Sequence, residues 1–141
     1  MGPNNFYEVT VVKAADLNSV ADVTGGTWAP GMMKHKIHAV AMLNGNAIGA
    51  AGVVKVDKRP TFGSDTSRGD GDIAVLNVPN GFAAGAVLYQ RCEPPVVMEP
   101  GTEAVIQVTD ATAASDVGTF VFLVEVIPEE PANMAAMTAT A

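Results

Sequence analysis

Cysteine is nearly absent from this chain of 141 residues. Cys92 is the only one, so an internal disulfide and a cysteine-only metal site are both excluded. A catalytic thiol needs a base that produces the thiolate, and Cys92 is followed by Glu93-Pro94-Pro95 with no histidine near it in sequence. We therefore expect Cys92 to be a partly buried thiol at the end of a strand.

Positive charge is missing from the last third of the chain. All eight basic residues lie between Lys13 and Arg91, and the net charge is −7. An acidic chain does not attract free nucleic acid, so we expect no direct binding to DNA or RNA. No apolar run approaches the roughly 18 residues of a membrane span. The first residues also lack the basic and apolar regions of a signal peptide, so we expect no membrane partner.

The sequence contains few of the residue sets that catalysis requires. The Gly-x-Ser-x-Gly motif of serine hydrolases and the Gly-Lys-Ser/Thr ending of a phosphate loop are both absent. His35 and His38 have a spacing that would suit two zinc ligands on a helix. The residues around them alternate as in a strand, however, so we expect solvated histidines at a strand edge. The prediction is a protein that is not an enzyme and has no cofactor or metal.

Alternation of apolar and polar residues, rich in valine and threonine, recurs along the chain. About eight short strands are indicated, and convincing amphipathic helices are absent. Their spacing predicts an all-β fold, an antiparallel β-sandwich or barrel with jelly-roll-like connections. The clearest strands are expected at residues 7–13, 34–43, 47–56, 73–79, 85–92, 103–109 and 119–127.

Turn sequences separate these strands. Asn44-Gly45 and Asn80-Gly81 each predict a two-residue hairpin turn. Pro100-Gly101 predicts a turn of type II. Residues 14–22 are expected to be weakly helical or looped, and residues 25–31 to form a turn around Trp28, the sole tryptophan.

The two ends of the chain differ from its centre. We expect residues 1–127 to form a single β-sandwich domain, in which residues 1–6 form a possible N-terminal arm. Residues 128–141 contain two prolines, no aromatic residue and no strand pattern. They are expected to be either a frayed tail or an arm that lies on a neighbouring subunit. In the second case, Met134 and Met137 could lie on one face of a short docked helix.

A polar segment, residues 57–72, holds seven of the 23 charged residues. Polar runs of this length are usually functional loops or disordered ones. Its aspartates lack the spacing of an EF-hand loop, so weak cation binding is the lesser alternative. Arg59 and Arg68 could instead pair with acids such as Asp65 and Asp70. We expect a self-paired connection that is available for contacts between subunits.

Several short segments resemble a known family. They are residues 7–17, 57–60 with 63–65, 78–81 with 83–85, 100–103, and 131–134. The chain resembles the small structural proteins of the head decoration, or capsid cement, type that tailed bacteriophages encode beside the major capsid protein. The resemblance implies a non-enzymatic homotrimer on the outer surface of the virion capsid, bound to the major capsid protein and bracing the shell. It also implies a β-sandwich or barrel with an extended terminal arm, and it brings no catalytic residues.

The residues expected at interfaces follow from their type, because tryptophan, methionine and arginine are favoured at interface centres. Trp28 could equally be a core residue under a loop. Two other functions remain open: a head–tail or tail structural protein, and a carbohydrate-binding β-sandwich displayed on a surface. The candidate contact residues are Trp28, Met32, Met33, Arg59, Asp65, Arg68, Asp70, Met134 and Met137.

Overall fold

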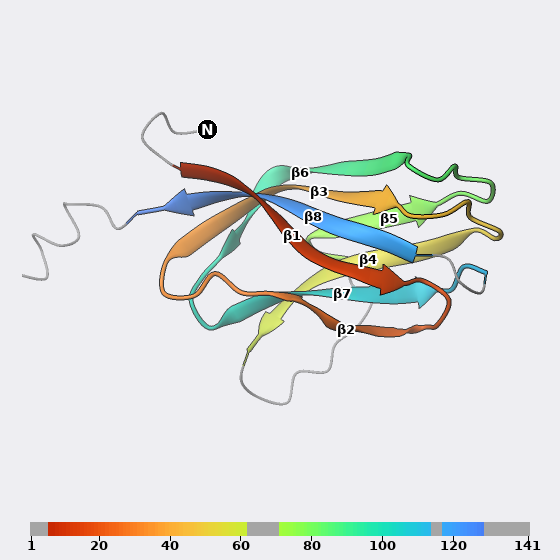
Figure 1. The fold of residues 1–141 in the computed structure, drawn as a ribbon. Helices are drawn as coiled ribbons and strands as arrows, with labels where there is room; N and C mark the ends of the chain where they lie inside the picture. Colours follow the sequence, from red (N-terminus) through yellow and green to blue (C-terminus); the bar gives the residue numbers. More distant parts are fainter. Residues whose placement is uncertain (1–5, 62–70, 114–116, 129–141) are drawn as a thin grey trace, which may run out of the picture.

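Eight β-strands, arranged as two four-stranded antiparallel sheets, form the structure, a computed structural model that describes residues 6–61, 71–113 and 117–128 (Figure 1). Sheet A has the order β1 (Phe6–Asp16), β8 (Val117–Ile127), β3 (Lys34–Asn44) and β6 (Val87–Met98). Sheet B has the order β2 (Ala21–Trp28), β7 (Thr102–Asp110), β4 (Gly52–Pro60) and β5 (Ala74–Val78). The predicted all-β fold is confirmed, and it is a sandwich because the sheets do not close into a barrel.

The strand order follows from one reversal of the chain, between β4 and β5. β4 pairs with β5, and outward from them β3 pairs with β6, β2 with β7 and β1 with β8. The chain is thus one long antiparallel ribbon, and successive strand pairs of this ribbon alternate between the two sheets. This wrapping is the jelly-roll arrangement.

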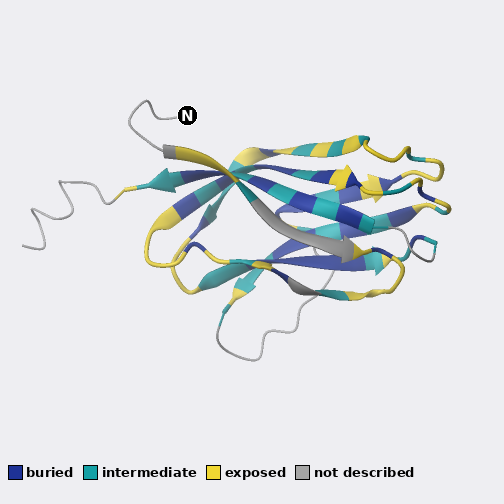
Figure 2. Ribbon diagram, in the orientation of Figure 1, coloured by how far each residue is buried: buried dark blue, intermediate teal, exposed yellow. Residues whose placement is uncertain are grey.

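The core lies between the two sheets and is built from every second residue of the strands (Figure 2). Along β8, Phe120, Phe122 and Val124 are completely buried, while the residues between them are partly exposed. Burying such side chains supplies most of the stability of a sandwich. The opposing contributions come from Ile37, Val40 and Met42 of sheet A and from Val54, Val56, Ile106 and Val108 of sheet B.

One strand was missed by the sequence prediction. Residues 21–28 form β2, where the sequence indicates a loop and a turn. β2 pairs with β7 only near its two ends, and the register shifts between Asp22 and Thr27. An irregular strand of this kind lacks the strict alternation that identifies strands from sequence. β6 was also predicted too short, because it continues to Met98.

The two predicted hairpin turns are wrong. Asn44-Gly45 follows β3 of sheet A, and the next strand, β4, belongs to sheet B. Asn80-Gly81 likewise lies where the chain passes from β5 of sheet B to β6 of sheet A. A ribbon that alternates between sheets needs crossing connections at these points, longer than a two-residue turn. The type II turn is confirmed: the Thr102 amide donates to the Glu99 carbonyl at 3.1 Å, and Gly101 has φ of 89°.

Asn44 has a different role from the one its turn sequence suggests. Its side-chain amide donates to the carbonyl oxygens of Phe82 and Ala83, at 3.0 and 2.9 Å. Its backbone amide also donates to the Ala86 carbonyl at 2.9 Å. Asn44 is 2% exposed and therefore fixes the connection between β5 and β6 against the end of β3.

We predict that Asn44→Ala lowers the free energy of unfolding by about 1–3 kcal/mol, because the carbonyl groups of Phe82 and Ala83 each lose one of their hydrogen-bond donors. Asn77→Ala, at an exposed position of β5, should change it by less than about 0.5 kcal/mol. Urea unfolding of the three proteins measures both values. Equal effects of the two substitutions would show that Asn44 does not hold the connection.

Candidate functional site

The loop of residues 29–33, which joins β2 to β3, presents the most exposed large hydrophobic side chain among the described residues. Met32 is 92% exposed and Met33 is 44% exposed. The loop lies at the end of the sandwich where β1 begins and β8 ends (Figure 1). The strand register agrees, because Lys34 is opposite Ile127. We call Met32 and Met33 the methionine tip.

Residues of the flanking strands hold the backbone of this loop in place. Trp28, at the end of β2, packs edge-on against the His35 ring of β3 with the ring centres 5.3 Å apart. The Nδ1–H of His35 donates to the Met33 carbonyl at 2.8 Å. Pro30 is buried, and Gly31 adopts φ of 70°, which favours glycine. The methionine tip is therefore presented by a loop with defined contacts.

This arrangement suits binding to another macromolecule. A methionine side chain is unbranched and polarizable, so it adapts to irregular apolar surfaces. A backbone that is already ordered loses less conformational entropy on binding. An adaptable side chain on a fixed backbone can thus contribute affinity at low entropic cost.

Trp28 is a core residue rather than a surface residue. Besides His35, its ring packs against Phe122 with centres 6.3 Å apart, and it is half-buried against the hydrophobic core. Of the two positions that the sequence left open for Trp28, the structure therefore shows the one in the core, under a loop. Its contribution to a contact surface is indirect, through the shape of the loop that carries the methionine tip.

The prediction of solvated histidines at a strand edge is wrong. β3 lies between β8 and β6, and His35 is 7% exposed. The Nε2–H of His38 donates to the carboxylate of Glu125 at 2.6 Å, and the Tyr7 ring lies 5.9 Å from the His38 ring. The sequence does not reveal strand order, and so it could not show that β3 is an inner strand. Among the described residues, no group of three or more His, Cys, Asp or Glu could hold a metal ion.

Among the described residues, Arg59 forms ion pairs with acids of the neighbouring strands of sheet B. Residues 57–60 belong to β4, and the Nε–H of Arg59 donates to Glu103 of β7 at 2.9 Å. A longer contact, 3.4 Å, joins its guanidinium to Asp22 of β2. The hydrogen bond to Glu103 is the main cause that raises the pKa of Arg59. Arg59 thus links three strands of sheet B. The expected pairing with Asp65 or Asp70 lies outside the described residues.

The acids at the two ends of the polar segment bind backbone groups. Asp57 accepts a hydrogen bond from the Gly71 amide, and Asp72 accepts one from the Lys58 amide at 2.9 Å. These bonds join the end of β4 to the residues just before β5. Five of the expected contact residues lie outside the described residues: Asp65, Arg68, Asp70, Met134 and Met137.

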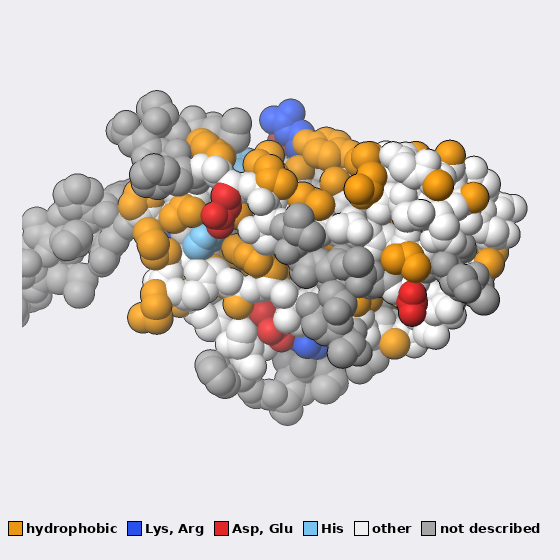
Figure 3. Space-filling view, viewed as in Figure 1, with side chains coloured by type: hydrophobic (Ala, Val, Ile, Leu, Met, Phe, Trp, Pro, Cys, Tyr) orange, Lys and Arg blue, Asp and Glu red, His pale blue; other side chains and the backbone are white. Residues whose placement is uncertain are grey.

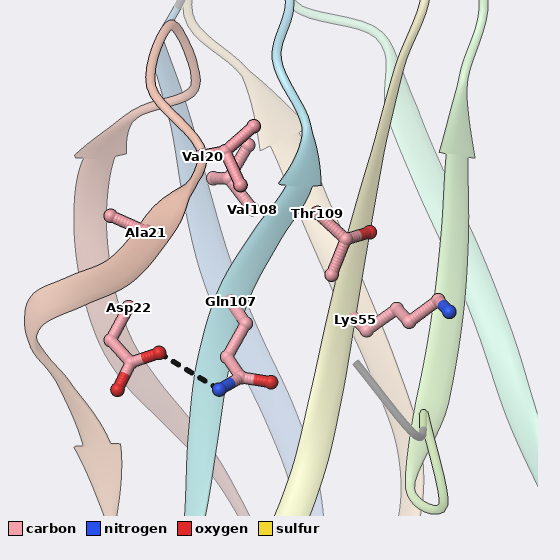
Figure 4. A pocket seen from close by; sticks show the side chains of 7 residues that line it. All are labelled: Val20, Ala21, Asp22, Lys55, Gln107, Val108 and Thr109. Atoms are coloured by element: carbon pink, nitrogen blue, oxygen red, sulfur yellow. Dashed lines mark hydrogen bonds between the residues drawn. The ribbon is translucent and has the colours of Figure 1, made fainter. Parts of the chain in front are cut away.

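A hollow on sheet B is a second candidate for a binding site (Figure 4). At its floor, the Gln107 side-chain amide donates to Asp22 at 2.8 Å. Carbohydrate sites usually stack a sugar on an aromatic ring, whereas the residues that line this hollow include no aromatic side chain. They are Val20, Ala21, Asp22, Lys55, Gln107, Val108 and Thr109.

Cys92 lies within β6 and not at a strand end, which corrects its predicted position. It is 5% exposed, and its thiol contacts the Ile73 carbonyl at 3.3 Å. Burial raises the pKa of Cys92 from 9.0 to about 11. The thiol therefore stays protonated and poorly nucleophilic at neutral pH.

This pKa predicts a loss of stability in alkali. The unfolded chain releases the thiol proton near pH 9 and the folded chain only near pH 11, so the stabilisation is complete below pH 9 and is lost as the pH rises to 11. Relative to Cys92→Ala, the free energy of unfolding should fall on the order of 2 kcal/mol between pH 8 and pH 11. Urea titrations of both proteins measure this difference. A difference that is constant with pH would contradict the assigned environment of the thiol.

Comparison with known proteins gave no match. No family model matches the chain, and no curated protein or solved structure is significantly similar to it. The described ranges contain no helix long and apolar enough to cross a membrane.

Proposed function

We propose that this chain is a non-enzymatic structural protein of a virion, which binds the outer surface of a tailed-phage capsid and stabilises the shell. In this proposal it acts as a homotrimer, and its partner is the major capsid protein. The observation that carries the proposal is the methionine tip, a strongly exposed apolar pair on an ordered loop. The jelly-roll sandwich and the resemblance of several short segments to capsid decoration proteins support it.

The position of the methionine tip suits attachment by one end of the sandwich. The described chain begins at Phe6 and ends at Pro128, and Phe6 is opposite Val126 in the sheet. The described chain therefore begins and ends at the end of the sandwich that carries the methionine tip (Figure 1). Terminal arms that extend from there could add contacts beside Met32 and Met33. The arms themselves stay a prediction.

Binding through several subunits at once compensates for the low affinity of each contact. Two methionine side chains bury little area, and a single contact of this size is weak. When several subunits of one oligomer bind the same shell, each later contact forms at a high effective concentration. The overall affinity then exceeds that of one contact by orders of magnitude. A protein that bridges capsid subunits in this way resists their separation.

The double substitution Met32→Ser, Met33→Ser should weaken capsid binding at least about tenfold, because it removes roughly 1.4 kcal/mol or more of apolar contact. Val20→Ser is the matched control, since Val20 is 67% exposed and lies in the connection between β1 and β2. Cosedimentation with expanded shells, assembled from the major capsid protein encoded beside this chain, measures the affinity. Both variants should keep the wild-type unfolding temperature, because these side chains are exposed.

Two results would contradict the proposal. The first is a wild-type protein that does not cosediment with the shells. The second is a double variant that binds as tightly as Val20→Ser, which would place the contact elsewhere on the molecule.

Deletion of residues 128–141 tests the predicted arm separately. β8 ends at Ile127, so the truncated chain keeps all eight strands. We expect weaker cosedimentation with the shells and an unchanged urea midpoint. A large loss of stability would show instead that the segment is part of the folded core.

A further inference from the structure

The outer face of sheet A is the largest collection of exposed apolar side chains on the described chain. Five of the eight large hydrophobic side chains that are exposed lie on it. In Figure 3, hydrophobic side chains gather along the upper strands of the view, which belong to sheet A. The five are Tyr7, Val9, Leu43, Val87 and Tyr89, with exposed fractions of 36, 68, 44, 56 and 60%.

The strand register shows that these side chains form one surface. Val9 is opposite Leu123, which is opposite Ala39 in the next strand. One row further along, Val121 is opposite Ala41, and Ala41 is opposite Tyr89. Residues directly opposite each other in antiparallel strands lie on the same face. The apolar surface therefore runs across all four strands.

The outward side chains of this face differ in size from one strand to the next. Its outward positions on β3 include Ala39 and Ala41, which are small. The neighbouring strand β6 presents Val87 and Tyr89, which are larger and more than half exposed. A second copy of the same face can pack its apolar side chains against those of the first. Two sheets with such faces pack at the spacing found within a β-sandwich.

The area of the face matches an interaction surface. The exposed parts of its large apolar side chains sum to an area on the order of 400 Å², a size at which an exposed patch is often functional. A standard interface takes about 800 Å² from each partner and has an apolar centre with a polar rim. The apolar part of sheet A thus supplies roughly half of that area, and the polar residues around it can supply the rest.

The distribution of charge on this face favours a second copy of the chain as its partner. The chain as a whole carries −7, so two copies repel each other over most of their surfaces. The outer face of sheet A instead carries cations and carboxylates together, and two of its charges are already paired, Arg91 with Glu93 at 2.6 Å. Glu125 is hydrogen-bonded to His38 and 3% exposed. The charged residues described on this face are Asp16, Lys34, Lys36, Arg91, Glu93 and Glu125.

We infer that the outer face of sheet A binds a second copy of this chain. The inference deepens the proposed function, because it names the surface through which the proposed homo-oligomer forms. A two-fold arrangement places the two faces against each other, and a three-fold arrangement places Val87 and Tyr89 of each copy on the face of the next. Both arrangements remove the same apolar side chains from water.

Two valines allow a matched test of this surface. Val9 is on the outer face of sheet A and 68% exposed, whereas Val20 is off it and 67% exposed. Sedimentation equilibrium of the full chain, over about 1 to 200 µM, measures self-association because the populations depend on concentration. We expect wild-type protein and Val20→Lys to form the same oligomer. Val9→Lys and Tyr89→Lys should weaken self-association at least about tenfold, since each buries a charge in an apolar interface.

The outcomes separate this inference from the proposed function. A wild-type protein that is monomeric throughout this range, or an oligomer that Val9→Lys and Tyr89→Lys leave unchanged, overturns the inference. If such a monomer still binds expanded shells, the capsid proposal survives alone. An oligomer that Val9→Lys and Tyr89→Lys dissociate, in a protein that does not bind shells, supports the inference and contradicts the capsid proposal.

Discussion

The antiparallel ribbon that turns between β4 and β5 determines where the features of this molecule lie. Because β1 pairs with β8 along its whole length, the first and last described strands share one end of the sandwich. β3 begins opposite the last residues of β8, which brings the loop before it to the same end. The methionine tip is thus beside both described chain ends as a consequence of strand pairing. The wrapping also makes β3 and β8 the inner strands of sheet A.

The sequence was informative where burial alternates residue by residue. β8 was predicted from its period of two, and its inward side chains Phe120, Phe122 and Val124 are completely buried. Prediction failed where the answer depends on distant strands. The burial of His35 and the partner of His38 require the knowledge that β3 lies beside β8, 87 residues away at the His38–Glu125 contact. Turn residues such as Asn-Gly do not show whether a connection crosses from one sheet to the other.

The candidate site was predictable in part. Met32 and Met33 were identified by residue type beside the turn expected at residues 25–31, and both are exposed. Trp28 and Arg59 were chosen by the same criterion, but their side chains make contacts within the domain. Residue type alone does not separate an interface residue from one that shapes its surroundings. The outer face of sheet A was not identified at all, because Val9, Leu43 and Tyr89 become neighbours only through the strand order.

The two outer faces of the sandwich differ in a way that fits a protein assembled into a larger particle. Sheet B is covered with hydrogen-bonded polar groups, including the links of Arg59 to Glu103 and of Gln107 to Asp22. Sheet A is apolar over most of its width, and the methionine tip lies at its end. In the proposed oligomer, each subunit contacts other copies through the outer face of sheet A. Each subunit contacts the capsid shell through its methionine tip. In that arrangement, contacts between copies and contacts with the shell use different residues.

The central claim is that this chain binds a capsid from outside. The most direct measurement is an electron cryo-microscopy map of expanded shells saturated with the purified protein. We predict added density on the outer surface, into which the jelly-roll sandwich fits with the loop of residues 29–33 toward the shell. A map without added density, or one in which this loop points away from the shell, would contradict the account.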